Sequence, residues 1–151
     1  MTDFLRYLKT ANPSMAEEFR KAGGATAATR GDKKFKDEWV KLAQKDPKFP
    51  QIEHDFIRQT HYDPEAAKIR STFGVNLDNR SRALREVIWS TAVQHRHKTE
   101  DIFRAALHGR KASDVTDRDL IKGIYADRMR LFPKLKKRYE SEEKSALKLL
   151  K

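Results

Sequence analysis

The side chains that could do chemistry in this sequence are a few carboxylates and histidines placed near aromatic residues. Hydrolysis of a glycosidic bond needs two carboxyl groups, one of which apolar surroundings keep protonated. Glu86 is a candidate for this acid because it lies in the same expected helix as Trp89, and Asp63 is a second acid. Neither has an evident partner carboxylate. The alternative for Glu86 is an ion pair with Arg82, four residues earlier, or with another nearby arginine.

The histidines give little support for a metal site. His54 and His61 lie seven residues apart, on one face of an expected helix, but no third ligand is evident. His95 and His97 would point to different faces of a helix. The chain has no Cys, which excludes disulfides and thiolate ligands. A phosphate-binding loop, a dinucleotide fingerprint and a Gly-x-Ser-x-Gly motif are also missing, so we expect no metal and no cofactor.

The elements that must position these residues are helices. Apolar residues recur at helical spacing along most of the chain, and Pro and Gly separate the runs. A chain of 151 residues suits one domain. The sequence therefore predicts an all-α fold of seven to nine helices with no substantial sheet. We expect a single helical domain over 1–151, with a mobile Gly/Ala/Thr segment at 23–31.

One expected helix, within residues 80–97, has an unusual polar end. Its sequence, RSRALREVIWSTAVQHRH, carries an apolar stripe and then Ser, Thr, Gln and His around a Trp. A plain core helix does not need this polar cluster. Two interpretations are open: a structural helix with buried hydrogen bonds, or one wall of a binding cleft.

The charge of the chain favours anionic partners. It carries 33 Lys and Arg against 22 Asp and Glu, a net charge of +11. Nucleic acid, anionic lipid and the acidic polymers of a bacterial wall all fit this balance. No apolar run is long enough to span a membrane, and the N-terminus MTDFLRYLKT has no signal-peptide core. We expect synthesis in the cytoplasm.

Three segments together resemble a known family. They are EWVKLAQKDPKFPQIEHDFIRQTHYDP (38–64), FGVNLDNRSRALREVIWSTAVQHR (73–96) and LIKGIYADR (120–128). They are similar to the C-terminal, chitosanase-like peptidoglycan hydrolase domain of type VI secretion spike proteins, and to domains of phage tail and virion proteins. That family belongs to the lysozyme-like superfamily.

The resemblance implies a site. The helix from Arg80 to His95 would pack centrally and lend polar side chains to a glycan cleft. The substrate-binding residues implied in this way are Thr60, His61, Tyr62, Trp89, Gln94 and His95. The resemblance also implies a cell-wall glycan as partner, or another protein of a phage or secretion assembly, with delivery by that machinery.

The sequence departs from the family in two places. The family carries its catalytic acids in an N-terminal segment, a glutamate helix followed by a Gly- and Asp-rich loop, and nothing here reproduces that segment. The glycine that usually follows WSTAVQH is Arg96 here. Loss of a general acid and its partner costs several orders of magnitude in rate.

Two functions remain open from the sequence. The first is a lysozyme-superfamily domain related to peptidoglycan-cleaving glycoside hydrolases, inactive by itself or using Glu86 as its acid in a muramidase- or chitosanase-like reaction. The alternative is a non-enzymatic basic module on a degenerate hydrolase scaffold: an inhibitor, a structural partner or a nucleic-acid binder.

Overall fold

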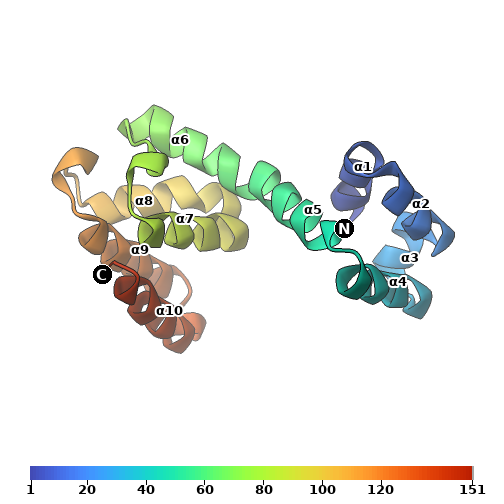
Figure 1. The fold of residues 1–151 in the computed structure, drawn as a ribbon. Coiled ribbons are helices and arrows are strands. Elements are labelled where there is room, and N and C mark those ends of the chain that lie inside the picture. Colours follow the sequence, from blue (N-terminus) through green and yellow to red (C-terminus); the bar gives the residue numbers. More distant parts are fainter. Residues whose placement is uncertain (151) are drawn as a thin grey trace. The chain divides into compact units, whose positions relative to one another are not determined.

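The computed structural model describes residues 1–150, and this part of the chain is helical with no strand. Figure 1 shows the ten α-helices, which short 3₁₀ turns or loops separate at most junctions. The helices are α1 (Thr2–Ala11), α2 (Pro13–Lys21), α3 (Gly24–Arg30), α4 (Lys33–Lys45), α5 (Lys48–Ile57), α6 (Asp63–Phe73), α7 (Arg82–His95), α8 (Thr99–Leu107), α9 (Asp117–Leu131) and α10 (Lys136–Lys148). The all-α prediction is confirmed. No helix is long and apolar enough to cross a membrane in the described part.

The contacts divide the chain into two compact units, residues 1–58 and residues 59 onward. A five-residue π-helical segment, Arg58–Tyr62, contains the boundary. Each unit has a hydrophobic core of its own. That the whole chain forms one domain stays a prediction.

The N-terminal unit is built around aromatic rings. Phe4 of α1 lies 5.3 Å from Trp39 of α4 between ring centroids, and Trp39 lies 5.1 Å from Phe49 of α5 in an edge-on arrangement. Phe19 of α2 contacts Phe35 at 5.1 Å. Tilted and edge-on ring pairs at these distances add to the stabilisation that burial alone provides.

Helix α3 occupies the segment 23–31 that the sequence predicted as loose and mobile. The glycines that suggested a loop stand at its two ends, where Gly23 (φ 103°) and Gly31 (φ 68°) adopt left-handed backbone conformations. Between them the chain is rich in alanine, the best helix former. Ala27 is buried in the aromatic core and anchors the helix. The segment is therefore helical, because the glycines cap a helix instead of interrupting one, and its mobility stays a prediction.

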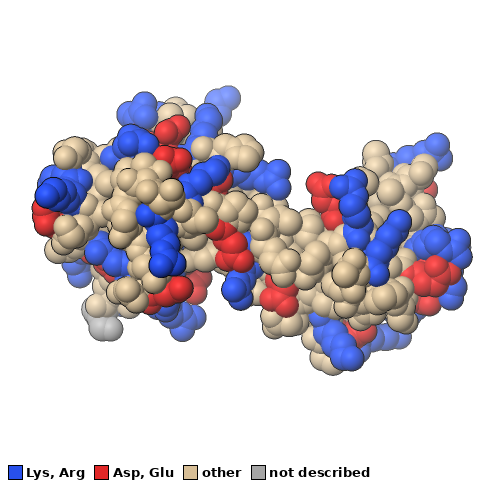
Figure 2. Space-filling model, turned by 90° about the horizontal axis from the view of Figure 1, so that it is seen from above, with Lys and Arg blue, Asp and Glu red and all other residues tan. Residues whose placement is uncertain are grey.

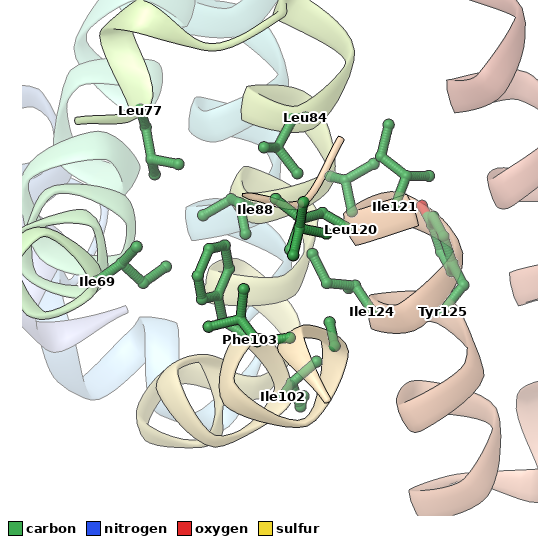
Figure 3. Packing of buried hydrophobic residues seen from close by; sticks show 14 of the residues in the cluster. Ile69, Leu77, Leu84, Ile88, Ile102, Phe103, Leu120, Ile121, Ile124 and Tyr125 are labelled. Carbon is green, nitrogen blue, oxygen red and sulfur yellow. The ribbon is translucent and has the colours of Figure 1, made fainter. Parts of the chain in front are cut away.

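The C-terminal unit has an aliphatic core. Side chains from α7, α8 and α9 point toward one another in one cluster (Figure 3). Its fully buried members include Leu84 and Ile88, Ile102 and Phe103, and Leu120, Ile121 and Ile124. Helices α6 and α10 add Ile69 and Tyr139 to the same core. Burial of this many apolar side chains, each contributing about 1.5–3 kcal/mol, holds the five helices together.

One carboxylate joins the starts of α7 and α9. Asp117 accepts a hydrogen bond from the backbone N–H of Ser81 at 2.7 Å and pairs with Arg80 at 2.8 Å. Ser81 in turn caps α7, since its Oγ accepts from the N–H of Leu84 at 3.1 Å. The orientation of α7 is therefore fixed at its N-terminus by polar contacts.

Helices α8 and α9 approach so closely that one position has no room for a side chain. A Cβ atom on Gly123 of α9 would lie 2.8 Å from Cα and 2.9 Å from Cβ of Ala106 on α8. Both distances are shorter than carbon atoms tolerate. Gly123 is therefore required for packing, even though glycine weakens a helix interior.

Gly123→Ala should lower the free energy of unfolding by about 1–3 kcal/mol, because the helices must separate to admit the methyl group. Urea denaturation measures this change. Without the steric contact, the substitution would stabilise the helix by about 0.5–1 kcal/mol. A more stable variant would contradict the close approach.

Candidate functional site

The polar end of α7 faces the interior of the C-terminal unit. Arg128 of α9 is fully buried, and its Nη2 donates to Oε1 of Gln94 at 2.6 Å. Longer contacts of 3.4 Å run from Nη2 to Oγ of Ser90 and from Nη1 to Oγ1 of Thr91. The polar side chains at the end of α7 thus surround a buried guanidinium. For Ser90, Thr91 and Gln94 this agrees with the interpretation of a structural helix with buried hydrogen bonds.

Helix α10 supplies the counter-charge and a ring for the same guanidinium. Glu142 lies 3.6 Å from Nη2 of Arg128 and also pairs with Arg138 at 2.6 Å. The ring of Tyr139 lies 4.4 Å from the guanidinium carbon, and the ring of Tyr125 lies 5.0 Å from it. Three helices therefore meet at Arg128. Charge pairing and cation–π contact offset part of the cost of burying the charge.

His95 is held in the same region. Its Nε2 is hydrogen-bonded to the hydroxyl of Tyr139 at 3.1 Å, and its ring stacks on Phe132 at 4.3 Å. Burial, followed by the positive charge of Arg128, lowers the pKa of His95 to about 4. The imidazole is therefore neutral at pH 7. Gln94 and His95 both have partners inside the unit.

Tyr62 and Trp89 form a second group. Their rings lie 5.3 Å apart at an angle of 32°, and both are partly exposed. Trp89 and Gln94 are five residues apart, about 140° around the helix, so they lie on different faces of α7. The six residues expected to bind substrate are thus distributed over two groups.

His61 and Thr60 adjoin Tyr62 in the chain. Oγ1 of Thr60 lies 2.7 Å from Nδ1 of His61. Burial, and next the charge of Arg96, lower the pKa of His61, so its imidazole is neutral at pH 7. Since Nδ1 is bonded to Thr60, Nε2 is the ring nitrogen that can bond to a sugar hydroxyl.

Arg96 occupies a strained position. It has φ 45° and ψ −115°, directly after the last residue of α7. Residues other than glycine rarely adopt positive φ. Glycine would adopt this backbone without strain, and Arg96 instead places a positive charge beside His61.

Glu86 lies on the exposed side of α7. Its side chain is 54% exposed and lies 3.5 Å from Nε of Arg82. A shallow groove of 270 Å³ runs past it, lined also by Ser90, Tyr125 and Glu142. The ion pair that the sequence offered as the alternative is present. A general acid is usually enclosed by apolar groups, whereas more than half of this side chain is exposed to solvent.

No group of three or more His, Asp or Glu side chains that could hold a metal ion occurs in residues 1–150. Sequence analysis missed Arg128, Tyr139 and Glu142 as members of the polar cluster. Arg128 ends the third segment of the resemblance, LIKGIYADR, but nothing local marks it as buried. The i, i+3 spacing of Tyr125 with Arg128, and of Tyr139 with Glu142, was the available signal.

Comparison with known proteins identifies the family. Residues 1–150 match the model of the type VI secretion system spike protein VgrG3-like C-terminal family. The type VI secretion system spike protein VgrG3 of Vibrio cholerae serotype O1 is 34% identical over a region that covers 78% of this chain. The chain belongs to the VgrG3-like C-terminal family of type VI secretion spike proteins. It spans only 12% of the length of the Vibrio relative.

Arg128→Ala should lower the free energy of unfolding by about 3–5 kcal/mol, because it leaves a cavity and removes the shared partner of Gln94 and Glu142. Arg130→Ala is the matched control, since Arg130 is an exposed arginine of the same helix that pairs with Asp127. It should cost no more than about 1 kcal/mol. Chemical denaturation compares the two, and equal effects would contradict a structural role for the buried guanidinium.

Acid should weaken the fold through His95. The pKa of His95 is about 6.5 in the unfolded chain and about 4 in the folded one. The unfolded state therefore takes up the proton first, and stability is lost as the pH falls from about 6.5 toward 4. Between pH 7 and pH 5 the loss should be about 1–2 kcal/mol. His95→Gln should show a smaller loss over the same interval in urea denaturation, and an unchanged slope would contradict the assignment.

Proposed function

We propose that this chain is a peptidoglycan-directed domain of a type VI secretion spike, which holds the wall glycan but does not cleave it by itself. Membership of the VgrG3-like C-terminal family over residues 1–150 is the observation that carries the proposal. The resemblance to chitosanase-like domains of the lysozyme superfamily supplies the ligand class. Delivery would follow from assembly of the spike with the secretion machinery.

The glycan-binding surface is formed by Thr60, His61, Tyr62 and Trp89. Pyranose rings present C–H groups that pack on the negative faces of aromatic rings, and Tyr62 and Trp89 lie together with part of each exposed. The neutral His61 beside them supplies hydrogen-bonding capacity. Gln94 and His95 contribute indirectly, because their contacts to Arg128 and Tyr139 fix the helix that carries Trp89.

The surroundings of Glu86 on α7 and of Glu142 on α10 support binding over cleavage. Glu86 is exposed beside Arg82, and Glu142 lies among Arg128, Arg138 and Tyr125. A glycosidase needs one carboxyl that keeps its proton and a second one at a suitable separation. Both carboxylates are instead paired with arginines.

The overall charge gives weaker support to the nucleic-acid alternative. In the view of Figure 2, Lys and Arg side chains form several separate groups, with acidic side chains among them. A nucleic-acid interface would gather them on one face together with exposed aromatic rings. The net charge of +11 would instead increase the affinity for an acidic wall in general.

Sedimentation with purified peptidoglycan tests the glycan-binding surface. The chain should pellet with the wall material, and the double variant His61→Asn, Tyr62→Leu should reduce its affinity about tenfold, because it removes the imidazole and one ring while keeping an apolar side chain. His108→Asn is the control: it removes an exposed histidine in the left-handed region, which asparagine tolerates. Equal retention of all three proteins would contradict the assigned surface.

The same suspensions report hydrolysis. Their turbidity should stay constant with the chain alone, because Glu86 and Glu142, the two acids of the groove, are both paired with arginines. Clearing that Glu86→Gln abolishes would overturn the non-cleaving part of the proposal and identify Glu86 as the acid.

A further inference from the structure

The C-terminal unit contains a 700 Å³ cavity that no part of the proposed function uses. It lies between the turn that follows α6 and the turn that follows α8. Its polar lining consists mainly of Asn76, Asn79, Arg80, Arg110, Lys111 and Ser113. None of these residues belongs to the surface around Tyr62 and Trp89.

The charges that line the cavity are all of one sign. Arg80, Arg110 and Lys111 line it, and none of its lining residues is acidic. Arg80 is held in place by Asp117 at 2.8 Å and by the carbonyl of Val115 at 2.9 Å, so its charge is already offset.

In the described part of the chain, the charges of Arg110 and Lys111, unlike that of Arg80, are not offset by a carboxylate. Within residues 1–150 neither has an ion-pair partner, and Arg110 donates from Nε to the carbonyl of Leu107. Two positive charges beside a cavity without carboxylates attract an anionic group, and the guanidinium and ammonium donate charge-assisted hydrogen bonds to it.

The rest of the lining consists of uncharged polar groups and one aromatic ring. Asn79 offers an amide with both donors and acceptor, and Asn76 offers its NH₂ group while its Oδ1 accepts from the N–H of Asp78. Phe73, partly exposed, provides an apolar wall. Amides, hydroxyls and an aromatic edge around a cavity of this volume fit a hydroxyl-rich ring, and a bare inorganic anion would use only the cationic end.

We propose that this cavity binds a saccharide that carries an anionic group, with Arg110 and Lys111 holding the anion and Asn76 and Asn79 holding the ring hydroxyls. A phosphate ester and a carboxylate share the chemistry that these residues recognise. The site is independent of the glycan-binding surface proposed above, since the two have no residue in common.

Calorimetric titration of the chain tests this proposal with three sugars: N-acetylglucosamine 6-phosphate, N-acetylmuramic acid and the neutral N-acetylglucosamine. At least one anionic sugar should bind, and the neutral sugar should bind at least about tenfold more weakly. Arg110→Ala with Lys111→Ala should reduce the affinity for the anionic sugar about tenfold or more. The single variant Lys111→Ala removes one of the two charges at an exposed position. It leaves the contact of Arg110 with Leu107 intact.

The matched control is Lys134→Ala with Lys137→Ala, which removes the same number of charges from exposed positions outside the cavity. Its affinity should stay within about twofold of the unaltered chain. Equal weakening by both double variants would overturn the site in favour of general surface charge. If neither anionic sugar binds, the proposed site is overturned. If inorganic phosphate binds as tightly as the phosphorylated sugar, the proposal that the ligand is a saccharide is overturned. Repeating the titrations on the His61→Asn, Tyr62→Leu variant should leave the anionic-sugar affinity unchanged, so the two proposals fail separately.

Discussion

The buried guanidinium of Arg128 is the interaction on which the C-terminal unit depends most. Burial of a charge is costly unless hydrogen bonds and an opposite charge accompany it. Here α7 contributes Gln94, and α10 contributes Glu142 and the face of Tyr139. Nε of Arg128 is buried with no hydrogen-bond partner among the described residues. The network therefore contributes more to fixing how three helices align than to net stability, because few alternative arrangements would satisfy the same donors.

This arrangement also explains the composition of α7. Its apolar residues form the core with α8 and α9, while Thr91 and Gln94 contact Arg128 of α9 and His95 contacts Tyr139 of α10. A helix that is buried on several sides must carry polar groups wherever a neighbour presents a charge. Trp89 then lies on the remaining face, next to Tyr62.

Local patterns in the sequence were sufficient for most helices. Apolar spacing predicted α7, and the helix is present with Ser81 as its cap. The same rules failed at α3, because a glycine signals a loop and a helix end equally well, and only the burial of Ala27 distinguishes them. The partner of Gln94 could not be predicted, since Arg128 lies 34 residues away and its burial depends on how α9 packs. The sequence identified the polar residues of α7 as unusual, but their direction is a property of the tertiary fold.

Asp117 acts on two helices and on the cavity at once. Its carboxylate is at the first residue of α9 and accepts from the N-cap residue of α7, so one negative charge lies near the positive ends of two helix dipoles. The same carboxylate neutralises Arg80 at the wall of the cavity. Loss of this single group would loosen both helix starts and raise the positive potential of the cavity together. Fold stability and electrostatic selectivity are thereby coupled through one acidic side chain.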